Sequence, residues 1–216
     1  EQLIESDAML RAVHQFVHQE FEHDPAHDIP HLYRVALWTI RLAGRLVPTR
    51  NAVAAALLHD LVNVPKNSPM RSRASELSAE KARPLLTELG FPSDDVSDIC
   101  AAIRDHSFSR GARPTSPLGE ALQDADRLEA LGAIGIARCF ATGGRMGISL
   151  WHPDDPWAQS RPLNDATYSL DHFFAKLLKL PDTFLTEAGR EEAHRRAARL
   201  ARYIDQLGEE LGEARP

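Results

Sequence analysis

Residues 52–60 read AVAAALLHD, and this stretch decides how the rest of the chain is interpreted. Its first seven residues are all apolar, so a helix here would be apolar on every side, which is typical of a central buried helix. The stretch ends in two ionisable residues, His59 and Asp60. Burying such groups is costly unless they are paired or hold a metal. The end of this helix is therefore a candidate functional site.

Apolar residues recur at spacings of three and four on both sides of this stretch, which predicts helices throughout. No strand-like alternation of useful length appears, so we expect an all-α fold. Pro84 predicts a helix start or a kink at that position. The apolar repeats place further helices at residues 9–21, 32–46 and 96–103, at residues 122–136 (one helix, or two that meet near Gly132), and from residue 166 onward.

Two segments do not fit a helical pattern. Residues 63–73 carry two prolines, a lysine and two arginines, and residues 142–165 carry three prolines, two tryptophans and a glycine pair. Loops of that length are usually lids or binding loops. We expect one helical-bundle domain over residues 1–216, with a core at about 20–140 and a C-terminal helical part at about 165–212.

Composition limits the classes of partner. The 216 residues carry a formal net charge of −6 and show no basic stripe, so a dedicated nucleic-acid surface is not expected. No apolar run reaches the length of a membrane span. Cys100 and Cys139 fit neither a metal spacing nor a disulfide framework, which favours a cytoplasmic protein. The sequence does not decide the oligomeric state, and a homodimer is one possibility.

Four side chains have the chemistry of a metal site. His31 begins a predicted helix after Pro30, and Asp126 lies in the amphipathic segment DADRLEAL. Together with His59 and Asp60 they offer two imidazoles and two carboxylates, a set that suits a divalent transition metal. Such a set leaves positions open for water and a phosphoryl oxygen, which is the chemistry of hydrolysis. Because the residues come from three helices, the bundle must bring them together.

The motifs HDIPHLYRV, AALLHDL, IRDHSFS, LQDADRLEALGAIGIAR and HFFAKLLKL extend the pattern over nearly the whole chain. With them the sequence resembles the HD-domain metal-dependent phosphohydrolases, closest to the small stand-alone bacterial HD proteins. The family's H…HD…D pattern matches His31, His59, Asp60 and Asp126. It places the fourth ligand in an Ala-Asp pair followed by a basic residue, which selects Asp126 over Asp124.

The resemblance implies hydrolysis of (d)NTPs to monophosphate and pyrophosphate with one divalent metal, foremost Mn²⁺, with Mg²⁺, Co²⁺, Ni²⁺ or Fe²⁺ as alternatives. A phosphomonoesterase acting on nucleoside monophosphates and a non-catalytic nucleotide sensor stay open as rivals. In the alarmone hydrolases, more distant relatives, acidic residues follow the HD pair. Here residues 61–64 read LVNV, without an acidic residue, so alarmone hydrolysis is not expected. The general base is left open between Asp60 and another carboxylate.

The remaining candidate residues surround these four ligands in the sequence. We expect Asp60 and His106 in catalysis, and His14 and His18 to be surface residues. The basic residues expected to bind phosphate are Lys66 and Arg71, with Arg73 beside them, Arg127 and Lys176, and the residues expected to support the ligands are His27, Asp28 and Asp124. Asp28 has a helix N-cap as its equal alternative.

Overall fold

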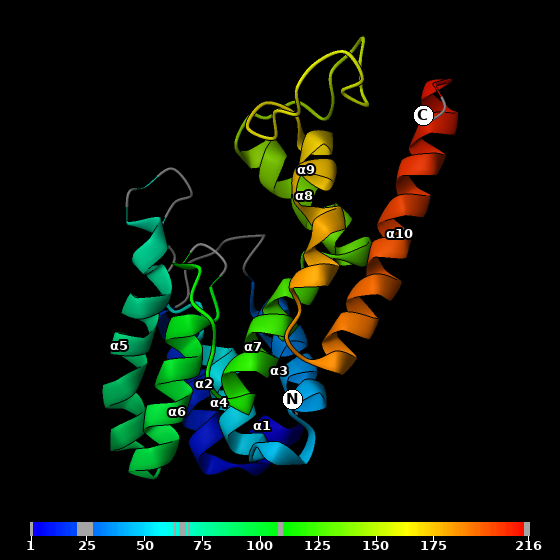
Figure 1. Cartoon of the computed structure of the whole chain (residues 1–216). Helices are drawn as coiled ribbons and strands as arrows, with labels where there is room; N and C mark the ends of the chain where they lie inside the picture. The colour runs from blue at the N-terminus through cyan, green and yellow to red at the C-terminus, as the bar shows by residue number, and fades with distance from the viewer. Residues whose placement is uncertain are drawn as a thin grey trace. The chain divides into compact units, whose positions relative to one another are not determined.

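The computed structural model describes residues 2–20, 28–62, 64, 68, 70–107 and 110–213. Over these residues the chain is helical and forms no strand, apart from an isolated bridge between Ser149 and Tyr168 (Figure 1). The all-α fold is therefore confirmed. The chain divides into two compact units, a first unit of residues 1–126 and a second unit of residues 127–216.

Helix α4 (Thr49–Leu58) is the centre of the first unit. Every residue of it from Asn51 onward is buried, and it contacts four other helices of the unit, α2, α3, α5 and α6. An apolar side chain of leucine size contributes about 1.5–3 kcal/mol when fully buried, so this helix anchors the core as its sequence predicts. The helices of this unit are α1 (Gln2–Ser6), α2 (Ala8–Glu20), α3 (Ile29–Ala43), α4, α5 (Ala74–Glu88), α6 (Ser93–Asp105) and most of α7 (Pro117–Leu128).

Proline 84 does not start a helix. Helix α5 runs from Ala74 to Glu88 with Pro84 inside it, so the expected start at this position is wrong. A proline there removes one backbone hydrogen bond, but α5 packs along α6 and buries Ala82 and Leu86. Tertiary packing therefore offsets the local cost.

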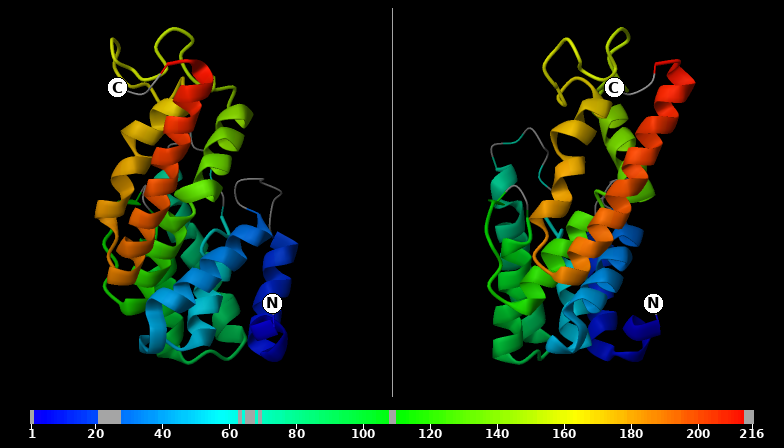
Figure 2. Two further views of the ribbon diagram at one scale, coloured as in Figure 1. Left: turned by 90° about the vertical axis from the view of Figure 1, so that its right-hand side faces the viewer. Right: turned by 45° about the vertical axis from the view of Figure 1, so that its right-hand side comes forward.

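The second unit holds the end of α7, then α8 (Gly132–Arg145), α9 (Ser169–Ala175), the 3₁₀ helix η4 (Leu177–Thr183) and α10 (Glu187–Leu211). Helix α8 contacts α9 and α10, and η4 contacts both α9 and α10 (Figure 2). Helices α7 and α8 meet at Gly132, whose φ of +70° suits glycine. None of the helices that the structure describes combines the length and the apolar composition of a membrane span.

The expected loop at residues 142–165 begins too early, because α8 continues to Arg145. Gly143 lies within that helix, and a Cβ built on it would fall 2.2 Å from Oγ of Ser169. This glycine permits close packing and does not form a turn. The irregular segment therefore covers residues 146–168.

That segment is held to α9 by one buried carboxylate. Asp171 is fully buried and accepts hydrogen bonds from both Nη atoms of Arg161, at 2.6 and 2.8 Å, and from the backbone N–H of Asn164 at 2.6 Å. The Arg161 guanidinium also lies over the ring of Tyr168, 4.7 Å from its centroid. The long segment is thus ordered by its own polar contacts.

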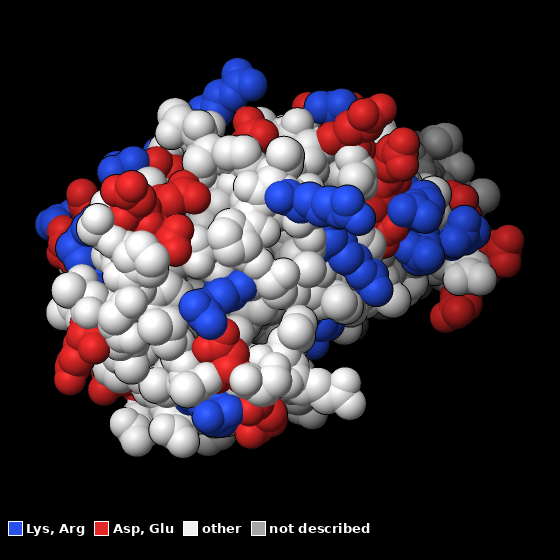
Figure 3. All heavy atoms as spheres, turned by 90° about the horizontal axis from the view of Figure 1, so that it is seen from below, with Lys and Arg blue, Asp and Glu red and all other residues white. Residues whose placement is uncertain are grey.

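Charged side chains of both signs are interspersed on the face of the molecule seen in Figure 3. No band of basic side chains alone crosses that face.

Candidate metal centre

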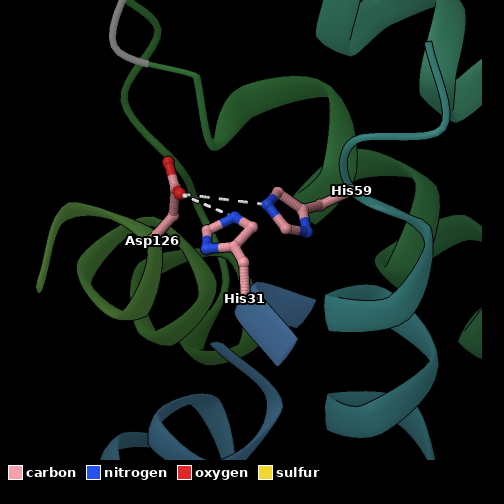
Figure 4. Close-up of side chains that lie close together, drawn as sticks. All are labelled: His31, His59 and Asp126. Atoms are coloured by element: carbon pink, nitrogen blue, oxygen red, sulfur yellow. Dashed lines mark ion pairs between the residues drawn. The ribbon is translucent and has the colours of Figure 1, made fainter. Parts of the chain in front are cut away.

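Three side chains predicted as metal ligands converge in the first unit. Figure 4 shows His31 at the start of α3, His59 at the end of α4 and Asp126 on α7 pointing toward one another. Nε2 of His31 lies 3.7 Å and Nε2 of His59 lies 3.8 Å from Oδ1 of Asp126. Both histidines are fully buried, whereas Asp126 keeps 29% of its side chain exposed. The centre is thus buried on its imidazole side and reachable from solvent on its carboxylate side.

Asp60 and His106 complete the cluster. Oδ2 of Asp60 lies 3.4 Å from Nε2 of His59 and 3.8 Å from Nε2 of His31, and its other oxygen lies 3.8 Å from Nε2 of His106. His106 is 4% exposed, and its ring packs edge-on against His59 at 4.9 Å between centroids. The four predicted ligands and the predicted catalytic histidine therefore lie in one place.

Helix ends explain how two of the histidines are aimed. His59 and His106 are the C-caps of α4 and α6. Nδ1 of His59 is 2.8 Å from the carbonyl oxygen of Ala56, and Nδ1 of His106 is 2.7 Å from that of Ile103. A carbonyl oxygen only accepts, so each Nδ1 donates, and in the neutral ring Nε2 carries the lone pair. This is how metal-binding histidines are usually oriented.

His31 is fixed through its backbone. Asp28 is the N-cap of α3, and its carboxylate accepts a hydrogen bond from the backbone N–H of His31 at 2.9 Å. Pro30 stands in the first turn, where a missing N–H costs nothing. Asp28 therefore takes the capping role that the sequence left open, and through it supports the placement of His31.

The electrostatics of the cluster favour a cation. Burial disfavours a charged His59 ring, but the carboxylates of Asp60 and Asp126 outweigh burial and raise the pKa of His59 to about 9. Burial and the neighbouring His59 lower the pKa of His106. Burial raises the pKa of Asp126, but the surrounding histidines outweigh it, so the net shift is downward. The carboxylates of Asp60 and Asp126 thus favour a positive charge at the position that the imidazole rings face.

The residues fit a metal ion. Donor atoms around an ion with bonds of about 2.1 Å lie roughly 3–3.5 Å apart, and the observed separations of 3.4–3.8 Å are only slightly wider. Among the described residues, Nε2 of His59 is buried without a hydrogen-bond partner, which an ion would remedy. His31, His59 and Asp126, and also His59, Asp60 and His106, form groups that could hold a metal.

The structure separates the two candidate aspartates of α7. Asp126 belongs to the cluster, whereas Asp124 is fully buried on the same helix and is absent from both metal-capable groups of described residues. Two residues along a helix differ by about 200° in direction, so both cannot face one point. The geometry therefore favours Asp126, as the sequence pattern does.

The structure describes only some of the basic residues that were expected to bind phosphate. Arg127 donates to the carbonyl oxygen of Thr183 at 2.7 Å within the second unit, and Lys176 is the C-cap of α9. Arg73 pairs with Glu76 at 3.1 Å. His27 and Lys66 lie outside the described residues, and Arg71 is described only as part of a short 3₁₀ helix at residues 71–73.

Gln123 joins two elements that carry residues of the centre, and the sequence did not single it out. It is 2% exposed, and its Nε2 donates to the carbonyl oxygens of Asp105 at 3.0 Å and Ala112 at 3.3 Å. It thereby ties α7, which carries Asp126, to the end of α6, which carries His106. The sequence signal that could have identified Gln123 is its position three residues before Asp126, on a similar face of the same helix.

Replacing Gln123 by leucine is expected to weaken Mn²⁺ binding by up to about tenfold, because groups bonded directly to metal ligands contribute about 10- to 100-fold and Gln123 acts through the backbone between α6 and α7. Calorimetric titration with Mn²⁺ measures the change. Gln206→Leu on the exposed face of α10 is the matched control and should bind as the unaltered protein does. Equal Mn²⁺ affinity in Gln123→Leu would show that this tie does not position the ligands.

Comparison with known proteins agrees with the site. The sequence profile of the HD domain matches residues 29–131, the range that contains every member of the cluster. The chain is 32% identical over 190 residues to YpgQ of Bacillus subtilis (strain 168), covering 86% of this chain and 84% of that protein.

Solved structures extend the likeness. The crystal structure of Bacillus subtilis YpgQ in complex with ADP is similar with a TM-score of 0.71 at 31% identity, covering 92% of this chain and 97% of that one. An HD-superfamily hydrolase from Bacillus thuringiensis gives a TM-score of 0.72 at 32% identity, over 94% and 96% of the chains. A predicted HD-superfamily hydrolase from an uncultured Thermotogales bacterium gives 0.65 at 30%, over 97% of both. The chain therefore belongs to the HD-domain family and is an HD-superfamily hydrolase.

Proposed function

We propose that this protein is a metal-dependent phosphohydrolase of nucleotides that cleaves (d)NTPs to nucleoside monophosphate and pyrophosphate. The observation that carries the proposal is that Nε2 of His31 and Nε2 of His59 each lie 3.4–3.8 Å from carboxylate oxygens of both Asp60 and Asp126. A relative with 31% identity crystallised in complex with ADP, which supports a nucleotide as the substrate class.

The four ligands would hold one divalent ion, with Mn²⁺ the first choice. A bound ion supplies Lewis acidity, lowering the pKa of water and withdrawing charge from a phosphoryl oxygen. The partial exposure of Asp60 and Asp126, 27% and 29%, gives a phosphate access to the open side of the centre.

The hydrogen bond from Nδ1 of His106 determines what the other ring nitrogen, Nε2, can do in proton transfer. Its Nδ1 donates to Ile103, so the neutral ring presents a lone pair at Nε2, 3.8 Å from Asp60. In that form it accepts a proton or binds a cation, and it donates a proton to a leaving oxygen only after it has been protonated. We assign His106 and Asp60 to proton transfer. Lys66 and Arg71, which belong to the first unit together with the metal centre, are assigned to charge neutralisation on the phosphates.

A panel of nucleoside mono-, di- and triphosphates tests the proposal, each with Mn²⁺, Mg²⁺, Co²⁺ or Ni²⁺ and with products separated by chromatography. Monophosphate and pyrophosphate from a triphosphate are the expected products. Asp60→Asn should lose activity, while Asp94→Asn, at an exposed helix start, is the control that should keep it.

Other products would overturn the proposal in distinct ways. Orthophosphate from monophosphates alone would indicate a phosphomonoesterase. Nucleotide binding without turnover under any of the four metals would indicate a sensor.

A further inference from the structure

A second pair of histidines lies on α2, a helix that carries none of the residues of the metal centre. His14 and His18 are one helical turn apart, and their Nε2 atoms lie 3.0 Å from each other. Their rings are nearly perpendicular, at 75°, with 4.3 Å between centroids. Residues at this spacing share one helix face, so the backbone itself holds the two nitrogens together.

A third polar group from another helix reaches the same nitrogen. The hydroxyl oxygen of Tyr33, on α3, lies 2.6 Å from Nε2 of His14. An imidazole nitrogen offers either one N–H or one lone pair, so it forms only one linear hydrogen bond. Nε2 of His14 therefore cannot satisfy Tyr33 and His18 together by hydrogen bonding alone.

We propose that His14 and His18, with the Tyr33 hydroxyl beside them, form a second metal site for an ion that prefers imidazole, such as Cu²⁺, Ni²⁺ or Zn²⁺. Two nitrogen ligands at about 2.0–2.1 Å from one ion and at right angles are about 3.0 Å apart, which is the observed separation. An ion between the rings would use both lone pairs, and His18 is exposed, so a solvated ion can reach it.

The donor set differs in kind from that of the first centre. Among the described residues this set consists of two imidazoles and a hydroxyl, and imidazole nitrogen favours ions high in the Irving–Williams order over Mn²⁺ and Mg²⁺. With Tyr33 contributed by α3, a bound ion would link α2 to α3 and stabilise the first unit by mass action.

The test is Ni²⁺ binding to tag-free protein, measured as bound ions per chain by equilibrium dialysis and metal analysis. His14→Gln and His18→Gln are each expected to bind one ion fewer than the unaltered chain at low Ni²⁺, because a single imidazole loses the chelate and at least about tenfold in affinity. His194→Gln, a lone exposed histidine on α10, is the matched control and should keep the full number.

Glutamine is a good helix former, so both variants should show unchanged helicity without metal. An equal ion count in the unaltered chain, His14→Gln and His18→Gln would overturn the second site. All these variants keep the ligands of the first centre, so loss of the second ion is read independently of nucleotide hydrolysis.

Discussion

His59→Ala is expected to lose bound Mn²⁺ and to reduce nucleotide hydrolysis by more than about a hundredfold. Residues that merely orient a metal ligand contribute about 10- to 100-fold, so loss of a ligand exceeds that range. His59 contributes the nitrogen nearest to a carboxylate of the cluster, 3.4 Å from Oδ2 of Asp60. Metal analysis of the purified protein and initial rates with Mn²⁺ and a nucleoside triphosphate measure both losses.

A structural collapse must be separated from loss of the ligand. His59 is fully buried, so His59→Gln, which keeps most of the side-chain volume, is measured beside His59→Ala. His194→Ala, an exposed histidine on α10, is the control that should keep both metal and activity. Normal Mn²⁺ content in folded His59→Ala and His59→Gln would remove this residue from the metal shell.

Asp171→Asn is expected to destabilise the protein by about 3 kcal/mol, because it breaks a buried ion pair and leaves the Arg161 guanidinium without its counter-charge. Asp171 is fully buried. Its carboxylate accepts hydrogen bonds from both Nη atoms of Arg161 and from the backbone N–H of Asn164. Urea unfolding followed by circular dichroism gives the free energy of unfolding for each variant.

Asp165→Asn is the matched control in the same segment. Asp165 is 46% exposed and pairs with His172 at 2.9 Å, so its loss is expected to cost less than about 1 kcal/mol. Replacing both members of the buried pair, as in Arg161→Met with Asp171→Leu, should cost less than Asp171→Asn alone, since no charge is then left buried. Similar unfolding free energies for Asp171→Asn and Asp165→Asn would contradict the structural role of the pair.

The core of the fold and of the site could be predicted from the sequence because both depend on local chemistry. The apolar run before His59 has no polar face, so α4 is buried, and the two ionisable residues that end it fall at a helix terminus. The choice of Asp126 came from the family pattern of an Ala-Asp pair followed by a basic residue, and the angular spacing of a helix adds that Asp124 cannot face the same point. Features that depend on local sequence, such as the burial and the end of α4, can therefore be predicted without knowing the tertiary packing.

The features that were missed depend on long-range packing. Pro84 lies inside α5, which packs along α6, so of the two expected alternatives the helix start is wrong. Gly143 lies inside α8, where a Cβ would fall 2.2 Å from Oγ of Ser169, 26 positions later. Gln123 acts through carbonyl oxygens 11 and 18 residues away, which no spacing rule reveals. The contact between His14 and Tyr33 likewise joins two helices.

Anomalous diffraction from crystals soaked in Mn²⁺ shows directly whether these four side chains bind one metal ion. One strong peak is expected between Nε2 of His31, Nε2 of His59 and the carboxylates of Asp60 and Asp126, within about 2.3 Å of its ligand atoms. A peak bound by Asp124 in place of Asp126, or no peak among these four side chains in crystals of active protein, would contradict it.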